Sequence, residues 1–339
     1  MSDDIELERL ADWAANNAPE VGAVTAAEKF PGGQSNPTYK LTADGRPLVL
    51  RRKPFGKLLP SAHAVDREFR LISGLHPTGF PVPKPIALCE DKEIIGAEFY
   101  LMEMVDGRTF WDGTLPDVEK QDRRGVYEAM TRTLAQLHNT DYVQAGLGDF
   151  GRPGNFFARQ VDRWTKQYRA AQTDDIPEIE KLIDWLPKSV PEQTHTSIIH
   201  GDYRIDNLIY AKDSTNVIAV IDWELATIGD PLADFAYLAM NWEMPAEGNS
   251  GLKGADIVAA NIPTLGDVVD LYCALTNRDT IPDLPWYFSF NMFRYASIVQ
   301  GIKKRSLDGN ASSEKADKTI ALLMPLAEAA WEQAQIAGA

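Results

Sequence analysis

The sequence predicts an α+β protein in two parts, a small and mainly antiparallel β part followed by a larger and mainly helical part. Within residues 1–105, short β-type runs alternate with turn signals, the strongest of which is Asp44-Gly45. Beyond about residue 108, the apolar residues recur at helical spacing. Two short apolar runs, 197–199 and 217–221, then enclose a loop of ionisable side chains. We therefore divide the chain into 1–105 and 106–339.

The composition is that of a globular protein with enough apolar residues for a large core. The chain has 339 residues, of which 44% are hydrophobic, and it contains eight Trp. No apolar run approaches about eighteen residues, the length of a membrane span, and the first residues do not form a signal peptide. Cys89 and Cys273 are too few for a disulfide framework. We expect a cytoplasmic protein with no membrane partner.

The chain is acidic, with a formal net charge of −15 at pH 7. This charge argues against a nucleic-acid partner and, taken alone, favours a cationic or neutral substrate. Basic residues nonetheless gather at Arg51, Arg52, Lys53 and Lys57, where a polyphosphate can use them. The sequence leaves the oligomeric state open.

A segment of glycine and small polar residues precedes a β-type run at about 38–42, after an amphipathic helix that we expect at about 5–16. The members of this segment are Gly32, Gly33, Gln34, Ser35 and Asn36. Backbone N–H groups in such a turn can face a phosphate. The alternative is a plain turn, and Pro37 removes one donor.

The strand expected at about 47–53 carries the basic residues Arg51 and Lys53 on one face. A helix expected from Ser61 to Leu75 carries Glu68 among apolar neighbours, with no basic residue three or four positions away. A buried carboxylate needs a cation, so we expect Arg51 or Lys53 to pair with Glu68. The alternative is a partly exposed Glu68 on a wide helix face.

The remaining elements follow from the same patterns. Strands are expected at about 85–90 and 96–104, and the second ends at a hinge, Val105-Asp106-Gly107. His138 is expected to be structural, and the aromatic stretch 286–293 is typical of a core, with some rings as candidates for a pocket wall. The expected helices lie at about 118–140, 156–171, 179–186, 231–242, 263–276, 284–304 and 313–336.

The segments 200–210 and 217–224 concentrate polar groups that a core does not need. Asp202 is a candidate acceptor for a hydroxyl proton. Asn207 and Asp222 are hard oxygen ligands of the kind that Mg²⁺ takes while it holds nucleotide phosphates. The alternative is a hairpin with a solvated polar turn.

An Asp followed five residues later by an Asn, and then by a second Asp after another strand, is the spacing of a protein-kinase catalytic loop. With His200-Gly201-Asp202, Ile221-Asp222-Trp223 and Asp230-Pro231, the chain resembles the aminoglycoside phosphotransferase and choline kinase-like family. The resemblance implies a protein-kinase-like two-lobed fold, ATP and Mg²⁺ as cofactors, and a small-molecule hydroxyl acceptor. It leaves ATP versus GTP open.

The resemblance also implies a role for each candidate residue. Asp202 would accept the hydroxyl proton, and Arg204 would offset charge at the γ-phosphate. Arg51 aligns with the Lys that the family carries in its strand, with Lys53 as the alternative. Asp234 would anchor the catalytic loop. The residues implied at the nucleotide are Gly32, Gly33, Gln34, Ser35, Asn36, Arg51, Lys53, Glu68, Glu103 and Val105, and those at the metal are Asn207 and Asp222.

The longer resemblance, through 59–64 and 159–168, is to phosphotransferase-like domains found alone in bacteria or joined to acyl-CoA dehydrogenases. It implies a hydroxyacyl-CoA acceptor. One alternative is an aminoglycoside or a choline-type amino alcohol, which the acidic charge favours. Another is a non-catalytic nucleotide-binding regulator, which the exchange of Lys for Arg51 favours. Asp149-Phe150-Gly151 spells a kinase metal motif but precedes the catalytic loop, so we assign it no metal role.

Overall fold

The computed structural model describes residues 5–31, 36–55, 64–244, 251–309 and 314–339. The chain divides into two compact units, each with its own internal packing. The first unit comprises Met1–Arg108, Tyr142–Gly148 and Asn207–Ala226, and the second comprises Thr109–Asp141, Asp149–Asp206 and Thr227–Ala339. The first unit therefore begins as one continuous segment and also takes in two later segments.

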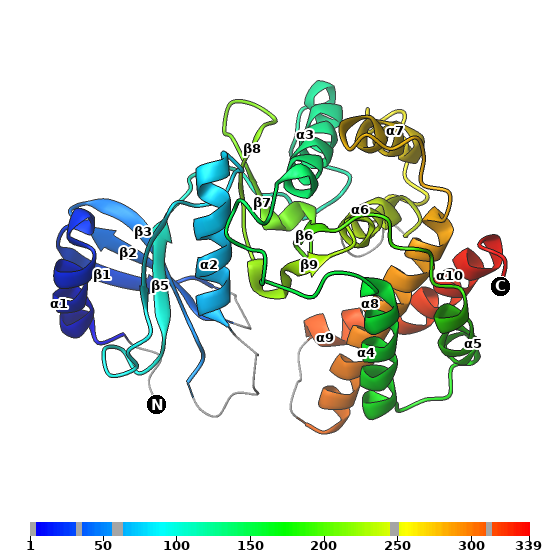
Figure 1. Cartoon of the computed structure of the whole chain (residues 1–339), viewed down its shortest axis with the longest axis horizontal. Coiled ribbons are helices and arrows are strands. Elements are labelled where there is room, and N and C mark those ends of the chain that lie inside the picture. The colour runs from blue at the N-terminus through cyan, green and yellow to red at the C-terminus, as the bar shows by residue number, and fades with distance from the viewer. Residues whose placement is uncertain (1–4, 32–35, 56–63, 245–250, 310–313) are drawn as a thin grey trace. The chain divides into compact units, whose positions relative to one another are not determined.

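A five-stranded antiparallel sheet forms the centre of the first unit, in the order β1-β2-β3-β5-β4 (Figure 1). Asp44 and Gly45 join β2 to β3 with φ angles of 48° and 73°, as the expected hairpin requires. The sequence pattern does not reveal β1, because only its first residue, Val24, is buried. The strands are β1 Val24–Lys29, β2 Thr38–Ala43, β3 Arg46–Arg52, β4 Pro85–Cys89 and β5 Phe99–Glu103.

Each face of this sheet is covered by one helix (Figure 1). The helix α1, Leu7–Asn17, packs its apolar stripe on one face, where the ring of Trp13 meets that of Phe99 edge to face, with centroids 4.8 Å apart. On the other face lies α2, Val65–Leu75, where the rings of Phe69 and Tyr100 are 5.9 Å apart. The alternation of side chains along β5 thus assigns Phe99 to α1 and Tyr100 to α2.

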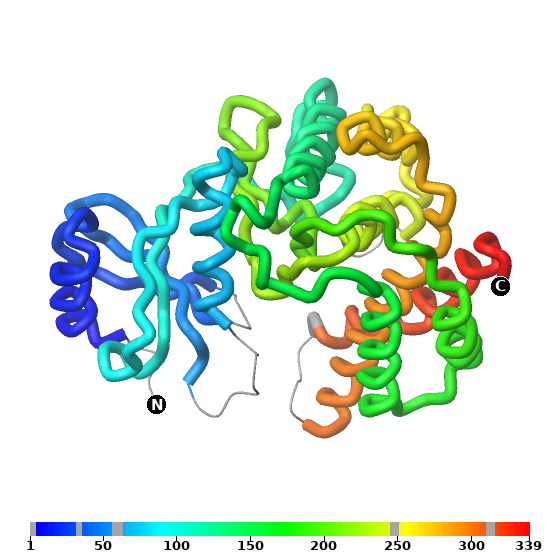
Figure 2. The backbone as a smooth tube through the Cα atoms, in the orientation of Figure 1, coloured from blue at the N-terminus to red at the C-terminus, as the bar shows by residue number. Residues whose placement is uncertain are grey.

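The described part of α2 begins at Val65, and the expected start at Ser61 lies outside the described residues. A two-stranded hairpin completes the first unit, with β7 Leu208–Tyr210 paired to β8 Val217–Val220 (Figure 2, yellow-green). The expected strand at 217–221 is thereby confirmed, and its partner β7 is a strand that the sequence pattern does not indicate.

The second unit is mainly helical and is built around the long helix α8, which packs against α4, α6 and α10. Phe157 lies among the rings of Trp286, Tyr287 and Phe290, with centroid distances of 5.3, 5.0 and 5.1 Å. All four side chains are buried, so these rings form core rather than a pocket wall. The helices are α3 Lys120–Asn139, α4 Phe156–Ala171, α5 Pro177–Trp185, α6 Leu232–Ala239, α7 Leu265–Leu275, α8 Leu284–Leu307, α9 Glu314–Ile320 and α10 Leu323–Ile336.

Two details of the second unit differ from the expected pattern. The single helix expected at 313–336 is interrupted after Ile320, and a new helix begins at Leu323. Pro325 explains the break, because it cannot donate the hydrogen bond that would continue the first helix. The expected strand at 197–199 is confirmed as β6, Ser197–Ile199, and its partner β9, Thr227–Gly229, is a strand that the sequence pattern does not indicate.

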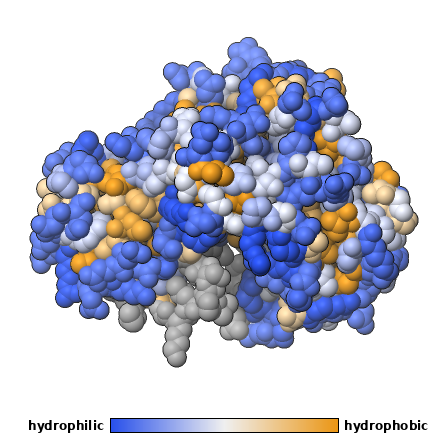
Figure 3. Space-filling model, viewed as in Figure 1, coloured by the Kyte–Doolittle hydropathy of each residue, from blue (hydrophilic) through white to orange (hydrophobic). Residues whose placement is uncertain are grey.

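The surface and the cysteines agree with the composition. Hydrophilic residues cover most of the face in Figure 3, and the hydrophobic areas on it are small and separate. Among the described helices, none is both long and apolar enough to cross a membrane. Cys89 and Cys273 are buried and form no disulfide.

The glycine-rich turn with the Asp149-Phe150-Gly151 motif has a structural role at its last residue. A Cβ atom at Gly151 would lie 2.5 Å from the backbone nitrogen of Ile228 and 2.5 Å from the Thr227 Oγ1. The turn therefore passes so close to β9 that only glycine fits. This close approach accounts for the glycine of the motif.

We expect Gly151→Ala to lower the free energy of unfolding by about 1–3 kcal/mol, because the added methyl group forces the turn away from β9. Gly148→Ala is the matched control, since a Cβ there meets only Val143, at 3.9 Å. Thermal and urea denaturation measure both variants. Equal stability of the two variants would contradict the close approach.

Candidate active site

A cluster of charged side chains in the first unit is centred on Arg51. Because Arg51 is the cross-strand partner of Tyr100, it faces α2. Its Nε lies 2.9 Å from the Glu68 carboxylate, and its Nη2 lies 2.7 Å from that of Asp222. Glu224 is farther away, with 3.7 Å between its Oε2 and the same Nη2. One guanidinium therefore joins a helix to the segment that follows β8.

Glu68 is held from three sides, although its side chain is almost fully buried. Besides Arg51, the side-chain amide of Asn36 donates a hydrogen bond to it over 2.7 Å, and the Tyr100 hydroxyl donates another over 3.1 Å. The expected pairing of Glu68 with a basic strand residue is thus confirmed, and the partner is Arg51. The neighbours that complete the arrangement are Asn36, two residues before β2, and Tyr100 of β5.

Burial dominates the electrostatics of this cluster. Burial raises the pKa of Glu68 to about 7, against the opposing effect of Arg51, and the nearby Asp222 adds to the rise. Burial alone would lower the pKa of Arg51, but Glu68 and Asp222 raise it above its ordinary value. The Arg51 guanidinium therefore stays positively charged, and the net charge of the cluster depends on the carboxylates around it.

Lys53 belongs to a different set of contacts. Its ammonium group is paired with Glu98 and lies 3.3 Å from Asp66. Burial opposes the charge of Lys53, but these two carboxylates raise its pKa overall. Asp66 thus pairs with Lys53, a residue of another element.

Asn207 and Asp222 lie at the same end of the β7–β8 hairpin. The Asn207 carbonyl accepts a hydrogen bond of 3.0 Å from the N–H of Ile221, the residue before Asp222. Asp222 has a left-handed backbone, with φ 66° and ψ 60°, a conformation that Asp tolerates better than most residues. Asn207 is buried, whereas the Asp222 side chain is about a third exposed.

This pair suits a hard cation that retains other ligands. One amide and one carboxylate are oxygen donors of the type that Mg²⁺ accepts, and Mg²⁺ is commonly bound by few protein groups together with phosphate oxygens and water. Within the described residues, no group of three or more His, Cys, Asp or Glu is arranged to hold a metal by itself. The donor set therefore fits a metal that arrives with a phosphate ligand.

The loop that contains Asp202 belongs to the second unit and is anchored by Asp234. The Asp234 carboxylate accepts hydrogen bonds from the backbone N–H groups of His200, over 2.5 Å, and Gly201, over 2.8 Å. The Nε2 atom of His138 lies 3.6 Å from the Asp234 carboxylate, and its Nδ1 atom lies 2.7 Å from the Tyr272 hydroxyl. These contacts fit the anchoring role expected of Asp234 and the structural role expected of His138.

The pKa of Asp234 moves in the direction that suits an anchor. Burial opposes its ionisation, yet His138, His200 and the backbone N–H of Gly201 lower its pKa below the ordinary value. Burial lowers the pKa of His138 as well. The loop is therefore tied to a carboxylate that stays ionised.

Asp202 is held by side chains on both sides of the loop. Its Oδ1 accepts a hydrogen bond of 3.0 Å from the Tyr237 hydroxyl and lies 3.2 Å from the Arg204 Nε. Arg204 also reaches Asp206, with 3.1 Å between Nη2 and Oδ2. The two predicted residues Asp202 and Arg204 are thus in direct contact. Tyr237, on α6, is a neighbour that sequence reasoning missed, because nothing in its spacing marks it.

The other predicted residues have simpler positions. Glu103 is the last residue of β5, and its N–H donates to the Lys84 carbonyl over 2.9 Å. Val105, two residues later, is half-buried. Gly32, Gly33, Gln34 and Ser35 lie outside the described residues. The structure therefore brings together Arg51, Glu68, Asn36 and Asp222 in the first unit, and Asp202 with Arg204 in the second.

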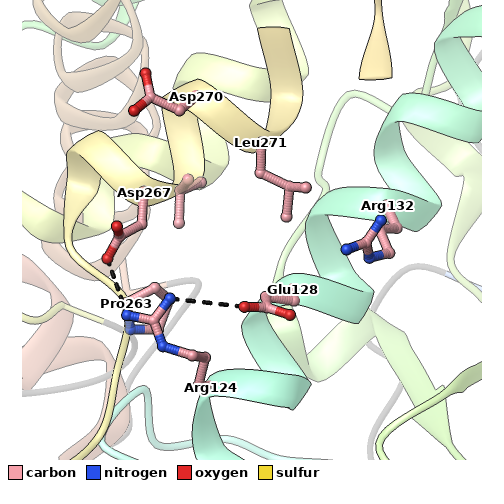
Figure 4. Close-up of a pocket in the computed structure, with 8 residues that line it drawn as sticks. Arg124, Glu128, Arg132, Pro263, Asp267, Asp270 and Leu271 are labelled. Atoms are coloured by element: carbon pink, nitrogen blue, oxygen red, sulfur yellow. Dashed lines mark hydrogen bonds and ion pairs between the residues drawn. The ribbon is translucent and has the colours of Figure 1, made fainter. Parts of the chain in front are cut away.

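One pocket in the second unit involves none of these residues. It lies between α3 and α7, and Arg124 at its edge reaches Asp267 over 3.0 Å and Glu128 over 3.6 Å (Figure 4). Because Arg124 joins acidic groups of both helices, these charges serve to hold the two helices together. We assign this pocket no role in chemistry.

Comparison with known sequences identifies the kind of protein to which these features belong. The model of a family described as the phosphotransferase enzyme family matches residues 26–255, which is more than half of the chain. Acyl-CoA dehydrogenase family member 10 of Mus musculus is 45% identical over 306 residues. The match covers 90% of this chain but only 29% of that relative, so the chain corresponds to a part of the longer protein.

Comparison with solved structures supports the fold. A protein from Ralstonia eutropha, provisionally identified as an aminoglycoside phosphotransferase, aligns with a TM-score of 0.90 and 42% identity over 98% of this chain and 99% of its own. Spectinomycin phosphotransferase, solved with ADP and spectinomycin, aligns with a TM-score of 0.66 over 98% of this chain and 100% of its own, at 12% identity. The expected kinase-like fold, an antiparallel sheet followed by a mainly helical part, is confirmed.

Glu68 and Glu98 provide a matched test of the electrostatics in the first unit. Burial raises the pKa of Glu68 from 4.5 to about 7, whereas the hydrogen bond from Lys53 lowers that of Glu98. The stability linked to Glu68 is present below pH 4.5 and is lost as the pH rises through about 7. The stability linked to Glu98 is present above pH 4.5 and is lost as the pH falls through its lowered pKa.

We therefore expect opposite pH dependences for the two Gln variants. Between pH 4.5 and 7, wild-type stability should fall relative to Glu68→Gln as the pH rises. Around and below pH 4.5, wild-type stability should rise with pH relative to Glu98→Gln. Urea denaturation across this pH range measures both differences. If the two stability differences changed with pH in the same direction, burial would not be the main cause of the pKa shift of Glu68.

Proposed function

The chain belongs to the phosphotransferase enzyme family, and we propose that it transfers the γ-phosphoryl group of ATP to a hydroxyl group of a small molecule. The observation that carries this proposal is the set of contacts at Arg51, where a buried Glu68 and a partly exposed Asp222 share one guanidinium. Phosphoryl transfer needs charge neutralisation and alignment more than covalent chemistry. The charged residues described above supply both.

Arg51 is the residue that we propose for the α- and β-phosphates, in preference to Lys53. Arg51 is steadied by Glu68 and stays charged, and its planar fork suits two phosphate oxygens. Lys53 is already engaged with Glu98 and Asp66. Asn36, the described member of the segment Gly32 to Asn36, hydrogen-bonds to Glu68, which ties the proposed phosphate-covering segment to the same cluster.

Asn207 and Asp222 would hold Mg²⁺ with their amide and carboxylate oxygens. When bound, Mg²⁺ neutralises charge on the nucleotide phosphates. Asp222 has the exposure needed to reach a ligand, and its present partner Arg51 is the residue proposed for the neighbouring phosphates. Backbone groups from Glu103 to Val105 are proposed for the adenine edge.

Asp202 is proposed to accept the proton of the acceptor hydroxyl and to orient its oxygen for attack. The hydrogen bond from Tyr237 fixes the Asp202 carboxylate, and the hydrogen bonds that the preceding backbone N–H groups donate to Asp234 fix the loop. Arg204 lies beside Asp202 and can offset the charge that develops on the transferred group. This arrangement combines a positioned base with a positioned cation.

For the acceptor, we propose a hydroxylated acyl-CoA. The support is the 45% identity with a relative named for the acyl-CoA dehydrogenases, in which a region similar to this chain covers 29% of the length. A region of this kind in such a protein suggests that both parts handle acyl-CoA compounds. An aminoglycoside is the second candidate, because the Ralstonia eutropha structure has been provisionally identified in that way.

A test of the reaction class is Asp202→Asn, which keeps the size of the side chain but removes the base. We expect acceptor-dependent ADP release to fall by about 10²- to 10⁴-fold, with Mg-nucleotide binding retained. Asp149→Asn, in the Asp-Phe-Gly turn, is the control and should retain full activity. The acceptors are hydroxyacyl-CoA thioesters, amino alcohols and aminoglycosides. Equal ADP release by wild type and Asp202→Asn with every acceptor would favour a non-catalytic nucleotide-binding protein.

A second test separates Arg51 from Lys53. We expect Arg51→Met to weaken binding of a non-hydrolysable ATP analogue by about 10- to 100-fold, since hydrogen bonds to charged groups are lost. Lys53→Met, the matched control, should change binding much less. Calorimetric titration in the presence of Mg²⁺ measures both. A larger loss for Lys53→Met would reverse the assignment.

A further inference from the structure

Arg294, on α8, lies next to the loop that contains Asp202 and comes from a part of the sequence that carries no motif. Its guanidinium lies over the ring of Tyr237, 5.2 Å from the centroid, and over that of Trp164, at 5.5 Å. Its Nη2 donates a hydrogen bond to the Gly201 carbonyl, one residue before Asp202. Three helices, α4, α6 and α8, thus hold this cation beside the proposed base.

The charge of Arg294 has no carboxylate partner in the part of the chain that the structure describes. Arg204, by contrast, contacts both Asp202 and Asp206. The guanidinium has five N–H donors, of which the Gly201 carbonyl takes one, and the side chain is half-buried rather than enclosed. Aromatic rings restrict its orientation without using its donors. Arg294 therefore retains donors and a positive charge close to Asp202.

This arrangement bears on the charge of the acceptor. Arg204 contacts two of the carboxylates at the loop, Asp202 and Asp206, and the third, Asp234, accepts hydrogen bonds from the loop backbone. Arg294 adds a second guanidinium beside the loop, and it would repel the ammonium groups of a polycation. An oxygen of a carbonyl or carboxylate group is what a guanidinium binds well. The net charge of −15 thus does not describe the surroundings of Asp202.

We propose that Arg294 is a specificity-determining residue, which binds a carbonyl oxygen of the acceptor a few atoms from the hydroxyl and disfavours cationic acceptors. This inference rests on the proposed phosphoryl transfer and deepens it, because it assigns the acceptor to hydroxylated acyl compounds. Trp164 and Tyr237 set the direction of the guanidinium. Tyr237 also contacts Asp202, so acceptor binding and base positioning share one aromatic ring.

The decisive comparison uses a hydroxyacyl-CoA thioester and the matching thioether, in which a methylene group replaces the carbonyl. We expect Arg294→Met to lower kcat/KM for the thioester by about 10- to 100-fold, mainly through KM, while KM for ATP stays nearly constant. The thioether should be a poor substrate for wild type and for Arg294→Met alike. Arg294→Lys, which keeps the charge, should restore part of the loss.

Arg163→Met is the matched control. Arg163 also lies over the Trp164 ring, 5.5 Å from its centroid, but its side chain is exposed and it has no contact with the Asp202 loop among the described residues. We expect this variant to keep the wild-type preference for the thioester. Circular dichroism and thermal denaturation verify that each variant is folded.

Three results would overturn the assignment of Arg294. One is an equal loss with thioester and thioether, which would leave Arg294 only its structural bond to Gly201. Another is a wild-type preference for choline or kanamycin over the thioesters. The third is unchanged kinetics in Arg294→Met.

If wild type transfers no phosphoryl group to any member of the panel, the proposed reaction fails while the inference about Arg294 is still tested. Calorimetric titration of wild type and Arg294→Met with thioester and thioether then decides it. Weaker binding of the thioester alone would support recognition of the carbonyl. Equal binding of both compounds by both proteins would overturn it.

Discussion

The buried ion pair between Arg51 and Glu68 is the interaction on which the first unit depends. Placing two charges in the interior is costly, and the cost is recovered only when further hydrogen bonds complete the pair. Here Asn36 and Tyr100 donate to Glu68, and Asp222 takes the other end of the guanidinium. The pair therefore joins β3, β5, α2, the residues just before β2 and the segment that follows β8. Removing Arg51 would leave the buried Glu68 carboxylate without a cation.

The second unit fixes the position of the loop that contains Asp202 in a different way. There the backbone itself is held, because the ionised Asp234 accepts two successive N–H groups of the loop before Asp202. Arg294 binds the carbonyl of the same segment from another helix. A short loop whose donors and acceptors are both engaged has little freedom to move. Such restriction would let Asp202, the proposed base, act in one fixed orientation.

The sequence predicts those features of the fold and the site in which a residue differs from its neighbours along the chain. Asp44-Gly45 marked the hairpin by its turn chemistry, and Glu68 marked its ion pair by having no basic neighbour on its helix. Arg51 and Lys53 were indistinguishable, because they share a face, and the partners that separate them, Asp66 and Glu98, come from other elements. The contacts of Tyr237 and Arg294 with the loop depend on how distant helices pack, which no local pattern records. Strands of three residues, such as β7 and β9, are too short to show a period.

The helix α8 has a consequence for how this protein can change its substrate. Phe290 packs in the aromatic core beside Phe157, and Arg294 follows it by four residues, about one helical turn, on the same rigid rod. Any substitution in this core that shifts α8 also displaces the guanidinium of Arg294. Trp164, by contrast, is partly exposed on α4 and tolerates exchange more readily. Relatives that use a different acceptor should therefore differ first at Trp164. Arg294 should be retained as long as the aromatic core around Phe290 is retained.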